Sequence, residues 1–352
     1  MIPDCTVDLM VTSPPYPMIE MWDNIFAKQN RSIREALNAG DGSRAFELMH
    51  KELDKVWIEV NRVLKEGGFA CINVGDATRT IRGEFRLYAN HSRILERCLE
   101  LGFRPLPEIL WRKLTNVPNK FIGSGMLPPG AYVTLEHEFI LILRKGSKRE
   151  FSEKEKINRQ RSAYFWEERN LWFSDIWENL SGTKQNNIDK DIRSRSGAYP
   201  FELPYRLINM FSLREDTVLD PFLGTGTTTL ASMVTGRNSI GLEIDPNLKE
   251  HILLRFSGVV DFANQLIENR LKNHMLFVEE RIKNQEMPKH LNRHYGFPVM
   301  ATQETEISFD ELNKIEIEDN GILEIEYREE PTFSFSNNRI ERKGKVSLDH
   351  WT

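Results

Sequence analysis

A glycine-rich turn between an apolar strand and a helix has the composition of a ligand-binding loop. It runs from Asp220 to Thr228 and reads Asp-Pro-Phe-Leu-Gly-Thr-Gly-Thr-Thr. Glycines allow a tight turn and the close approach of a ligand, and the following helix offers free N–H groups at its positive dipole end. Glu243 ends the next apolar strand, where an acid would meet ribose hydroxyls in a nucleotide-type fold. A P-loop and a dinucleotide fingerprint are excluded, because the Gly-Lys-Ser/Thr and the third glycine are absent. The pattern favours a nucleoside ligand without a pyrophosphate.

A second loop follows the apolar strand expected at residues 7–12. It reads Ser13-Pro14-Pro15-Tyr16. The prolines fix φ and remove two N–H donors, so the carbonyls of Ser13 and Pro14 are held out as acceptors beside a hydroxyl and an aromatic ring. As a bare tetrapeptide it could equally be a stiffened turn. Next to a ligand-binding turn we interpret it as a catalytic loop.

The elements that must position these loops alternate along the chain. Strands are expected at residues 7–12, 69–74, 107–111, 138–144, 217–220 and 239–244, with helices at 31–64, 91–101, 204–211 and from 227. This alternation predicts an α/β fold with a mostly parallel sheet. Both loops then project from the carboxyl ends of neighbouring strands and can share a cleft.

The composition is that of an ordinary globular protein, with 352 residues, 40% hydrophobic and 28% charged. Cys5, Cys71 and Cys98 show no paired spacing, which argues against a disulfide framework or a zinc knuckle. No signal peptide and no apolar run of membrane length is present, so we expect a cytoplasmic protein without a membrane partner. The net charge of −5 conceals an acidic segment at residues 301–330, and the positive remainder permits a polyanionic partner.

The two loops resemble those of the amino-methylating DNA methyltransferases, which use S-adenosyl-L-methionine. The Ser-Pro-Pro-Tyr loop resembles the catalytic motif of that family, and the glycine turn resembles its cofactor motif. Arg62–Gly68 is similar to the passage after the catalytic loop, and Tyr199–Pro204 to the segment before the cofactor strand. The resemblance covers roughly residues 3–255 in one order. Because the catalytic loop comes first, it is closest to the permuted, or beta, class.

This resemblance implies a Rossmann-like methyltransferase sheet with circularly permuted motif order, an inserted DNA-recognition region and a C-terminal extension. The expected units are a catalytic half (residues 1–144), a target-recognition region (145–198), a cofactor-binding half (199–255) and the extension (256–352). Relatives commonly carry one more strand before the catalytic strand. We expect a segment near Val299–Thr302 to supply it beside Val7–Val11.

The implied reaction is methylation of an exocyclic amine of a DNA base. Hydrogen bonds from the amine to the Pro14 carbonyl and Ser13 Oγ would hold the nitrogen nearer to tetrahedral, with its lone pair toward the methyl sulfonium. The base must leave the duplex, and Tyr16 would stack on it. Cytosine C5 methylation is excluded because none of the three cysteines follows a proline.

Serine at position 13 usually accompanies cytosine N4 in this family, which makes N4 of cytosine the expected target. Adenine N6 is the alternative, and a non-catalytic nucleic-acid-binding subunit with this fold is another. An RNA or protein substrate is also open. The expected partners are double-stranded DNA and a cognate restriction endonuclease that forms no stable complex with this chain.

The resemblance also implies particular site residues. The implied cofactor contacts are Asp220, Pro221, Phe222, Gly224, Gly226, Thr227, Glu243 and Phe201. Phe201 could equally be a core aromatic. The implied DNA contacts are Lys145, Lys148 and Arg149 on phosphates and Arg193 and Arg195 on base edges, although each could be an ordinary solvated residue. Loops at residues 112–130 and 28–50 are further candidates. No metal is expected, since Glu136-His137-Glu138 lacks a second histidine at helical spacing.

Overall fold

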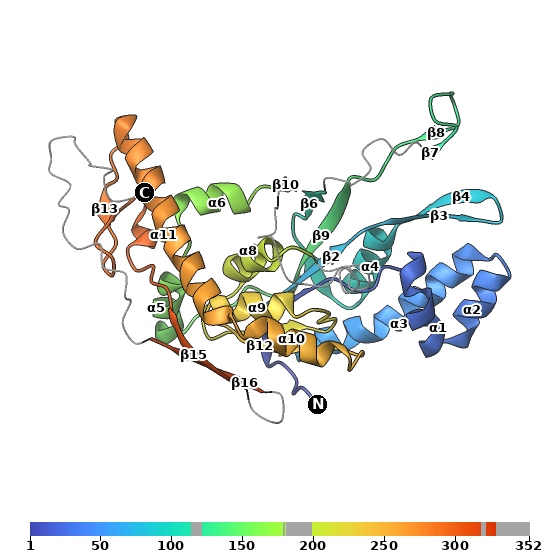
Figure 1. Cartoon of the computed structure of the whole chain (residues 1–352), viewed down its shortest axis with the longest axis horizontal. Coiled ribbons are helices and arrows are strands. Elements are labelled where there is room, and N and C mark those ends of the chain that lie inside the picture. Colours follow the sequence, from blue (N-terminus) through green and yellow to red (C-terminus); the bar gives the residue numbers. More distant parts are fainter. Residues whose placement is uncertain (114–121, 179, 181–198, 318–321, 329–352) are drawn as a thin grey trace.

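One mixed sheet forms the centre of the computed structural model, which describes the chain except for residues 114–121, 179, 181–198, 318–321 and 329–352 (Figure 1). The strand order is β10-β6-β9-β2-β1-β11-β12, and β5 also pairs with β9. The strands are β1 (Val7–Thr12), β2 (Leu64–Val74), β5 (Phe103–Pro105), β6 (Ile109–Arg112), β9 (His137–Lys145), β10 (Ile176–Trp177), β11 (Thr217–Asp220) and β12 (Asn238–Gly241).

Strand β1 lies between two parallel neighbours. Leu9 pairs with Phe69 of β2 on one side and with Val218 of β11 on the other. β12 continues in parallel beyond β11. These four strands end at the same edge of the sheet, which we call the carboxyl edge. The predicted α/β class with a mostly parallel sheet is confirmed. Among the strands of this sheet β9 alone runs the other way, antiparallel to β2, β5 and β6, which makes the sheet mixed.

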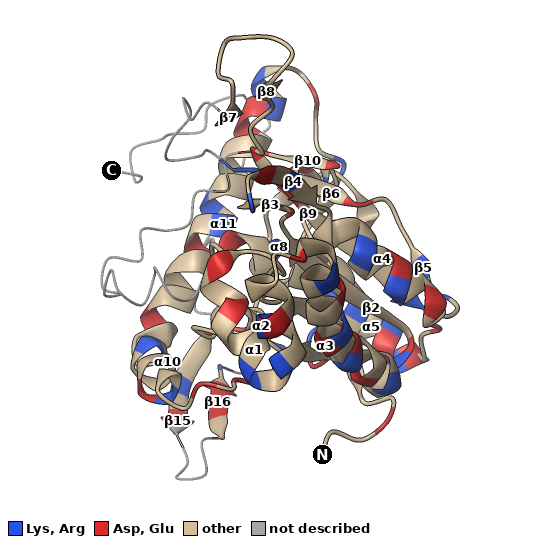
Figure 2. Ribbon diagram, turned by 90° about the vertical axis from the view of Figure 1, so that its right-hand side faces the viewer, with Lys and Arg blue, Asp and Glu red and all other residues tan. Residues whose placement is uncertain are grey.

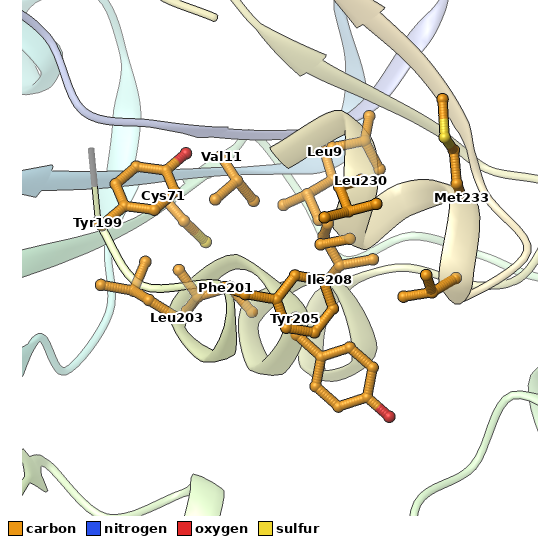
Figure 3. Packing of buried hydrophobic residues seen from close by; sticks show 14 of the residues in the cluster. Leu9, Val11, Cys71, Tyr199, Phe201, Leu203, Tyr205, Ile208, Leu230 and Met233 are labelled. Carbon is orange, nitrogen blue, oxygen red and sulfur yellow. The ribbon is translucent and has the colours of Figure 1, made fainter. Parts of the chain in front are cut away.

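Helices cover both faces, because successive side chains of a strand point to opposite sides. Leu9 and Val11 face one buried cluster and Met10 faces the other. The first cluster is covered by α8 (Glu202–Phe211), α9 (Thr227–Val234) and α11 (Val259–Lys283), and the second by α3 (Gly42–Val63) and α4 (Asn90–Glu100). Figure 3 shows β1 residues against α8 in the first cluster. Val259 and Ala263 of α11 are part of it, so the segment after residue 255 completes the core of the sheet.

The remaining elements surround this core. They are η1 (Glu20–Trp22), α1 (Asp23–Gln29), α2 (Arg31–Asn38), α5 (Glu153–Arg161), α6 (Trp166–Trp172), α10 (Leu248–Phe256), η2 (Thr302–Glu304) and the hairpins β3–β4 (Ala77–Ile81, Glu84–Tyr88), β7–β8 (Ile122–Gly123, Ala131–Tyr132), β13–β14 (His290–Leu291, Pro298–Val299) and β15–β16 (Leu312–Ile317, Leu323–Tyr327). No helix among the described residues is both long and apolar enough to span a bilayer.

The prediction of an added strand near Val299 beside β1 is wrong. Val299 pairs with His290 in the separate hairpin β13–β14. Both edges of β1 are already taken, by β2 and β11, so it has no free hydrogen-bonding edge for a further strand.

Candidate active site at the carboxyl edge

The direct pairing of β1 with β11 brings the two predicted loops together. Thr12 ends β1 and Asp220 ends β11, and the Thr12 hydroxyl donates to Asp220 Oδ1 over 2.5 Å. The Ser-Pro-Pro-Tyr loop and the glycine turn therefore begin side by side. The predicted common edge for two loops remote in the chain is confirmed.

Asp220 joins the two loops rather than facing an open space. It is 2% exposed, and its two oxygens accept from the hydroxyls of Thr12, Thr228 and Tyr199 and from the backbone N–H of Phe222. Burial raises the pKa of Asp220, and these hydrogen bonds oppose the rise. Its carboxylate therefore holds the start of the Ser-Pro-Pro-Tyr loop and the glycine turn in a constant relative position.

The glycine turn is shaped by two left-handed residues. Gly224 has φ +53° and Gly226 has φ +76°, a region that favours glycine. A Cβ at Gly226 would lie 3.0 Å from Phe256 Cζ, so close packing of α10 also requires glycine there. A Cβ at Gly224 would meet nothing nearer than 3.9 Å. The turn is therefore packed at Gly226 and open at Gly224.

Glu243 lies over this turn. Its carboxylate accepts from the N–H of Gly224 over 2.8 Å and from the N–H of Asp245 over 2.8 Å. Each oxygen keeps a further lone pair for a ligand hydroxyl. A cavity of about 720 Å³ borders the turn at Leu223 and Glu243 and extends along β12 to β16, without reaching the Ser-Pro-Pro-Tyr loop. An open glycine, an exposed carboxylate and a cavity of this size fit a nucleoside ligand.

Arg255 of α10 is a site residue that the sequence did not point out. Its guanidinium donates to the Thr225 carbonyl over 2.9 Å and to the Thr227 hydroxyl over 3.0 Å. Burial lowers the pKa of Arg255 to about 10, so the side chain is still a cation at neutral pH. It braces the start of α9, where Thr227 lies. No local sequence signal marks it, because the contact joins segments about 30 residues apart.

The Ser-Pro-Pro-Tyr loop belongs to a hydrogen-bonded network at the same edge. Ser13 Oγ is 2.9 Å from Tyr16 Oη, which donates to Glu138 Oε2 over 3.0 Å. Asn73 Nδ2 donates to Tyr16 Oη over 2.9 Å and to Glu138 Oε2 over 2.7 Å. Lys113 Nζ donates to Glu138 Oε1 over 2.6 Å. Glu138, set aside as a metal ligand, thus holds Tyr16.

Two aromatic residues predicted beside the cofactor pack against helices, Phe201 fully buried and Phe222 partly buried. Phe201 is 4% exposed and packs against Tyr205 and Phe262, with ring centroids 5.5 and 5.0 Å away (Figure 3). This matches the core alternative for Phe201 rather than a cofactor contact. Phe222 follows Pro221 in the turn, and its ring meets Trp57 edge-on at 6.1 Å. These aromatic rings hold the loops onto the helices.

The basic residues that begin the predicted recognition region are not near the loops. Arg144 pairs with Phe69, whereas Phe139 pairs with Val74 at the carboxyl edge. Because β9 runs antiparallel, Lys145, Lys148 and Arg149 emerge at the opposite edge, about 17 Å along the sheet. That they contact DNA phosphates stays a prediction, and the structure places them at the edge away from the two loops.

Their contacts are also structural. Lys145 donates to the backbone carbonyls of Asn61 and Leu64, and Arg149 pairs with Asp216 over 2.8 Å. Figure 2 shows basic and acidic positions interspersed along α4 and α5 rather than separated by sign. Arg193 and Arg195 lie outside the described residues. Their flanks return to the carboxyl edge, since Trp177 ends β10 and the Tyr199 hydroxyl reaches Asp220.

The sequence is similar to a known protein family and to several characterised proteins. A protein-family profile described as DNA methylase, of the N6/N4 methyltransferase type, matches residues 7–254. The type II methyltransferase M.MthZI of Methanothermobacter thermautotrophicus is 47% identical over 347 residues, which span 98% of this chain and 95% of that protein. M.MjaI of Methanocaldococcus jannaschii, also a type II methyltransferase, is 54% identical over 259 residues, or 70% of this chain and 84% of that protein.

A solved structure shares the fold. The putative DNA modification methylase of Thermus thermophilus, crystallised with S-adenosyl-L-methionine, is 32% identical. It superposes with a TM-score of 0.56 over 73% of this chain and 88% of that one.

Proposed function

Since the chain belongs to the N6/N4 DNA methylase family, we propose that it transfers a methyl group from S-adenosyl-L-methionine to the exocyclic N4 of cytosine in double-stranded DNA. The observation that carries this proposal is the bond between Thr12 and Asp220, which sets the catalytic loop beside the glycine turn. By analogy with the type II relatives, the methylation would protect host DNA from a cognate restriction endonuclease.

The glycine turn has the features needed to hold the methyl donor. When bound, S-adenosyl-L-methionine supplies an electrophilic methyl group on a sulfonium. Glu243 would accept from the ribose hydroxyls, and the open face at Gly224 would admit the methionine end. Thr227, braced by Arg255, would present the start of α9 to that end.

The catalytic loop would prepare the base amine. The lone pair of that amine is delocalised into the ring, so the nitrogen is a poor nucleophile. Ser13 Oγ and the Pro14 carbonyl would accept its two hydrogens and favour a tetrahedral nitrogen, while the shared edge aligns it with the donor. The ring of Tyr16 would cover the face of the extruded base.

Serine at position 13 supports cytosine as the target, and adenine N6 is the alternative within the same chemistry. Incubation of the protein with methyl-labelled S-adenosyl-L-methionine and duplex DNA, then nucleoside mass spectrometry, separates them. We expect N4-methylcytosine. N6-methyladenine would overturn the target assignment, and absence of any methylated nucleoside would overturn the proposed activity.

Substitution at the catalytic loop tests the assigned roles. Ser13→Ala should lower the rate of transfer by about 100-fold, because one acceptor of the amine is lost. The affinity for S-adenosyl-L-methionine, measured by calorimetry, should stay at the wild-type value, because the glycine turn is unchanged. Full activity of Ser13→Ala would contradict the catalytic role of the loop.

Two hairpins supply a surface for the duplex next to the catalytic loop. β3–β4 begins just beyond the carboxyl end of β2, and the segment after β7–β8 enters β9 at His137, next to Glu138. The rings of Phe85 and Tyr132 stack at 4.8 Å and tie the hairpins together. The tip of β7–β8 exposes Met126 and Leu127, at 85% and 71%. We infer that this tip enters a groove of the DNA and supports the extrusion of a base.

A further inference from the structure

We propose that Glu138 is a positioning residue that acts through Tyr16 to turn the Ser13 hydroxyl, so that Ser13 Oγ accepts a hydrogen bond from the base amine. This inference rests on the proposed function and assigns a role to a side chain that does not itself meet the base.

The directions of the hydrogen bonds follow from counting protons. Glu138 receives donors from Lys113, Asn73 and Tyr16, the setting of an ionised carboxylate that can only accept. Burial, and after it the charge of Glu138, raise the pKa of Tyr16 well above its ordinary value, so Tyr16 keeps its single proton. That proton is committed to Glu138 Oε2.

The remaining bonds of Tyr16 must therefore be accepted by its oxygen. Asn73 Nδ2 donates to Tyr16 Oη, and the 2.9 Å contact with Ser13 can exist only if the Ser13 hydroxyl also donates. With its proton aimed at Tyr16, Ser13 Oγ has its lone pairs free for an incoming N–H. The opposite orientation would point the hydroxyl proton at the amine lone pair, the electrons that must attack the methyl group.

Gly75 shows that the place of Tyr16 is built into the fold. A Cβ at Gly75 would lie 3.0 Å from Tyr16 Cε2 and 3.3 Å from Glu138 Cγ. The absence of a side chain there lets the ring reach Glu138.

Glu138→Gln tests the proposal because an amide offers one oxygen and one NH₂ group. The Lys113 ammonium should hold the amide oxygen, which turns the NH₂ toward Tyr16 Oη. Tyr16 would then give its proton to Ser13, and the Ser13 proton would face the amine. We expect kcat to fall roughly 10- to 100-fold, the effect of one misdirected buried hydrogen bond. The affinity for S-adenosyl-L-methionine should not change, and this binding also verifies that the variant is folded.

A second substitution separates orientation from support of the fold. In the double variant Lys113→Met, Glu138→Gln, the amide oxygen is released from the ammonium and can accept from Tyr16 and Asn73. We expect kcat, measured at saturating DNA, to recover at least about 5-fold over Glu138→Gln alone. Glu136→Gln is the matched control, a half-buried glutamate two residues earlier that faces Arg112 and not Tyr16, and should keep the wild-type kcat.

Each result decides the matter. Wild-type kcat in Glu138→Gln would overturn the inference, and so would a loss that the double variant does not recover, since a merely supporting role gains nothing from removing Lys113. A wild-type protein that transfers no methyl group would overturn the proposed function, and this inference with it.

Discussion

Tyr199 and Thr12 reach Asp220 from segments far apart in the chain, and their hydroxyls share its two oxygens. Thr228 adds a third hydroxyl from the start of α9. At this scale the site is a buried acid surrounded by short polar side chains, which together fix the relation between two loops. The residue types of the two loops were enough to predict a ligand-binding turn and a catalytic loop. They did not predict that hydroxyl and N–H groups of the protein itself would hydrogen-bond to Asp220.

Because Tyr199 is buried, we expect the free energy of unfolding to fall at alkaline pH. Burial, and then the charge of Asp220, raise the pKa of Tyr199 well above its ordinary value, whereas in the unfolded chain the side chain ionises near pH 10. The folded state holds the proton more tightly, so this contribution is present below about pH 10 and is lost as the pH rises further. The free energy of unfolding of the wild type should fall more steeply than that of Tyr199→Phe, by up to about 1.4 kcal/mol per pH unit. Urea unfolding of both proteins between about pH 9 and 11 checks this, and equal slopes would contradict it.

Strands and loops account for most of what the sequence could predict. The strands that carry the two loops, β1 and β11, were predicted because apolar runs ending at prolines or glycines are local signals. The contacts of Glu138 and Arg255 were not predicted, because they depend on which strand lies beside which. Periodicity also does not give strand direction. The sequence therefore did not indicate that β9 would carry Lys145, Lys148 and Arg149 to the edge opposite the loops.

The hairpin β7–β8 can be tested by itself for a role in DNA binding. Replacing Met126 and Leu127 by serine should raise the dissociation constant for duplex DNA about 10-fold, because apolar contacts with the bases are lost. Leu276→Ser on α11, another exposed apolar position, is the control and should bind DNA normally. Fluorescence anisotropy with labelled duplex measures both. Unchanged affinity in the tip variant would show that β7–β8 does not engage DNA.

At the scale of the whole molecule, the two edges of the sheet have different roles. The carboxyl edge carries the loops, the hairpins and the flanks Trp177 and Tyr199. The opposite edge carries Lys145 and Arg149 in internal contacts. Among the described residues, the proposed DNA contact therefore lies at the carboxyl edge.

The salt dependence of DNA binding distinguishes the two edges. If Arg193 and Arg195, which are expected on base edges, also neutralise phosphates, each alanine substitution should reduce the slope of log affinity against log salt by about 1. Lys148→Ala should leave the slope unchanged, because that residue emerges at the far edge. A reduced slope for Lys148→Ala alone would place the duplex on the opposite side of the sheet.

Trp177 and Tyr199, the described residues that bracket most of the predicted recognition region, are buried in the same cluster. In the proposed reaction, methyl donor and target nitrogen would take their spacing from the paired strands β1 and β11, which lie outside that region. A different segment could be grafted between the two aromatic anchors, and a new DNA sequence recognised, with the reacting atoms left in place.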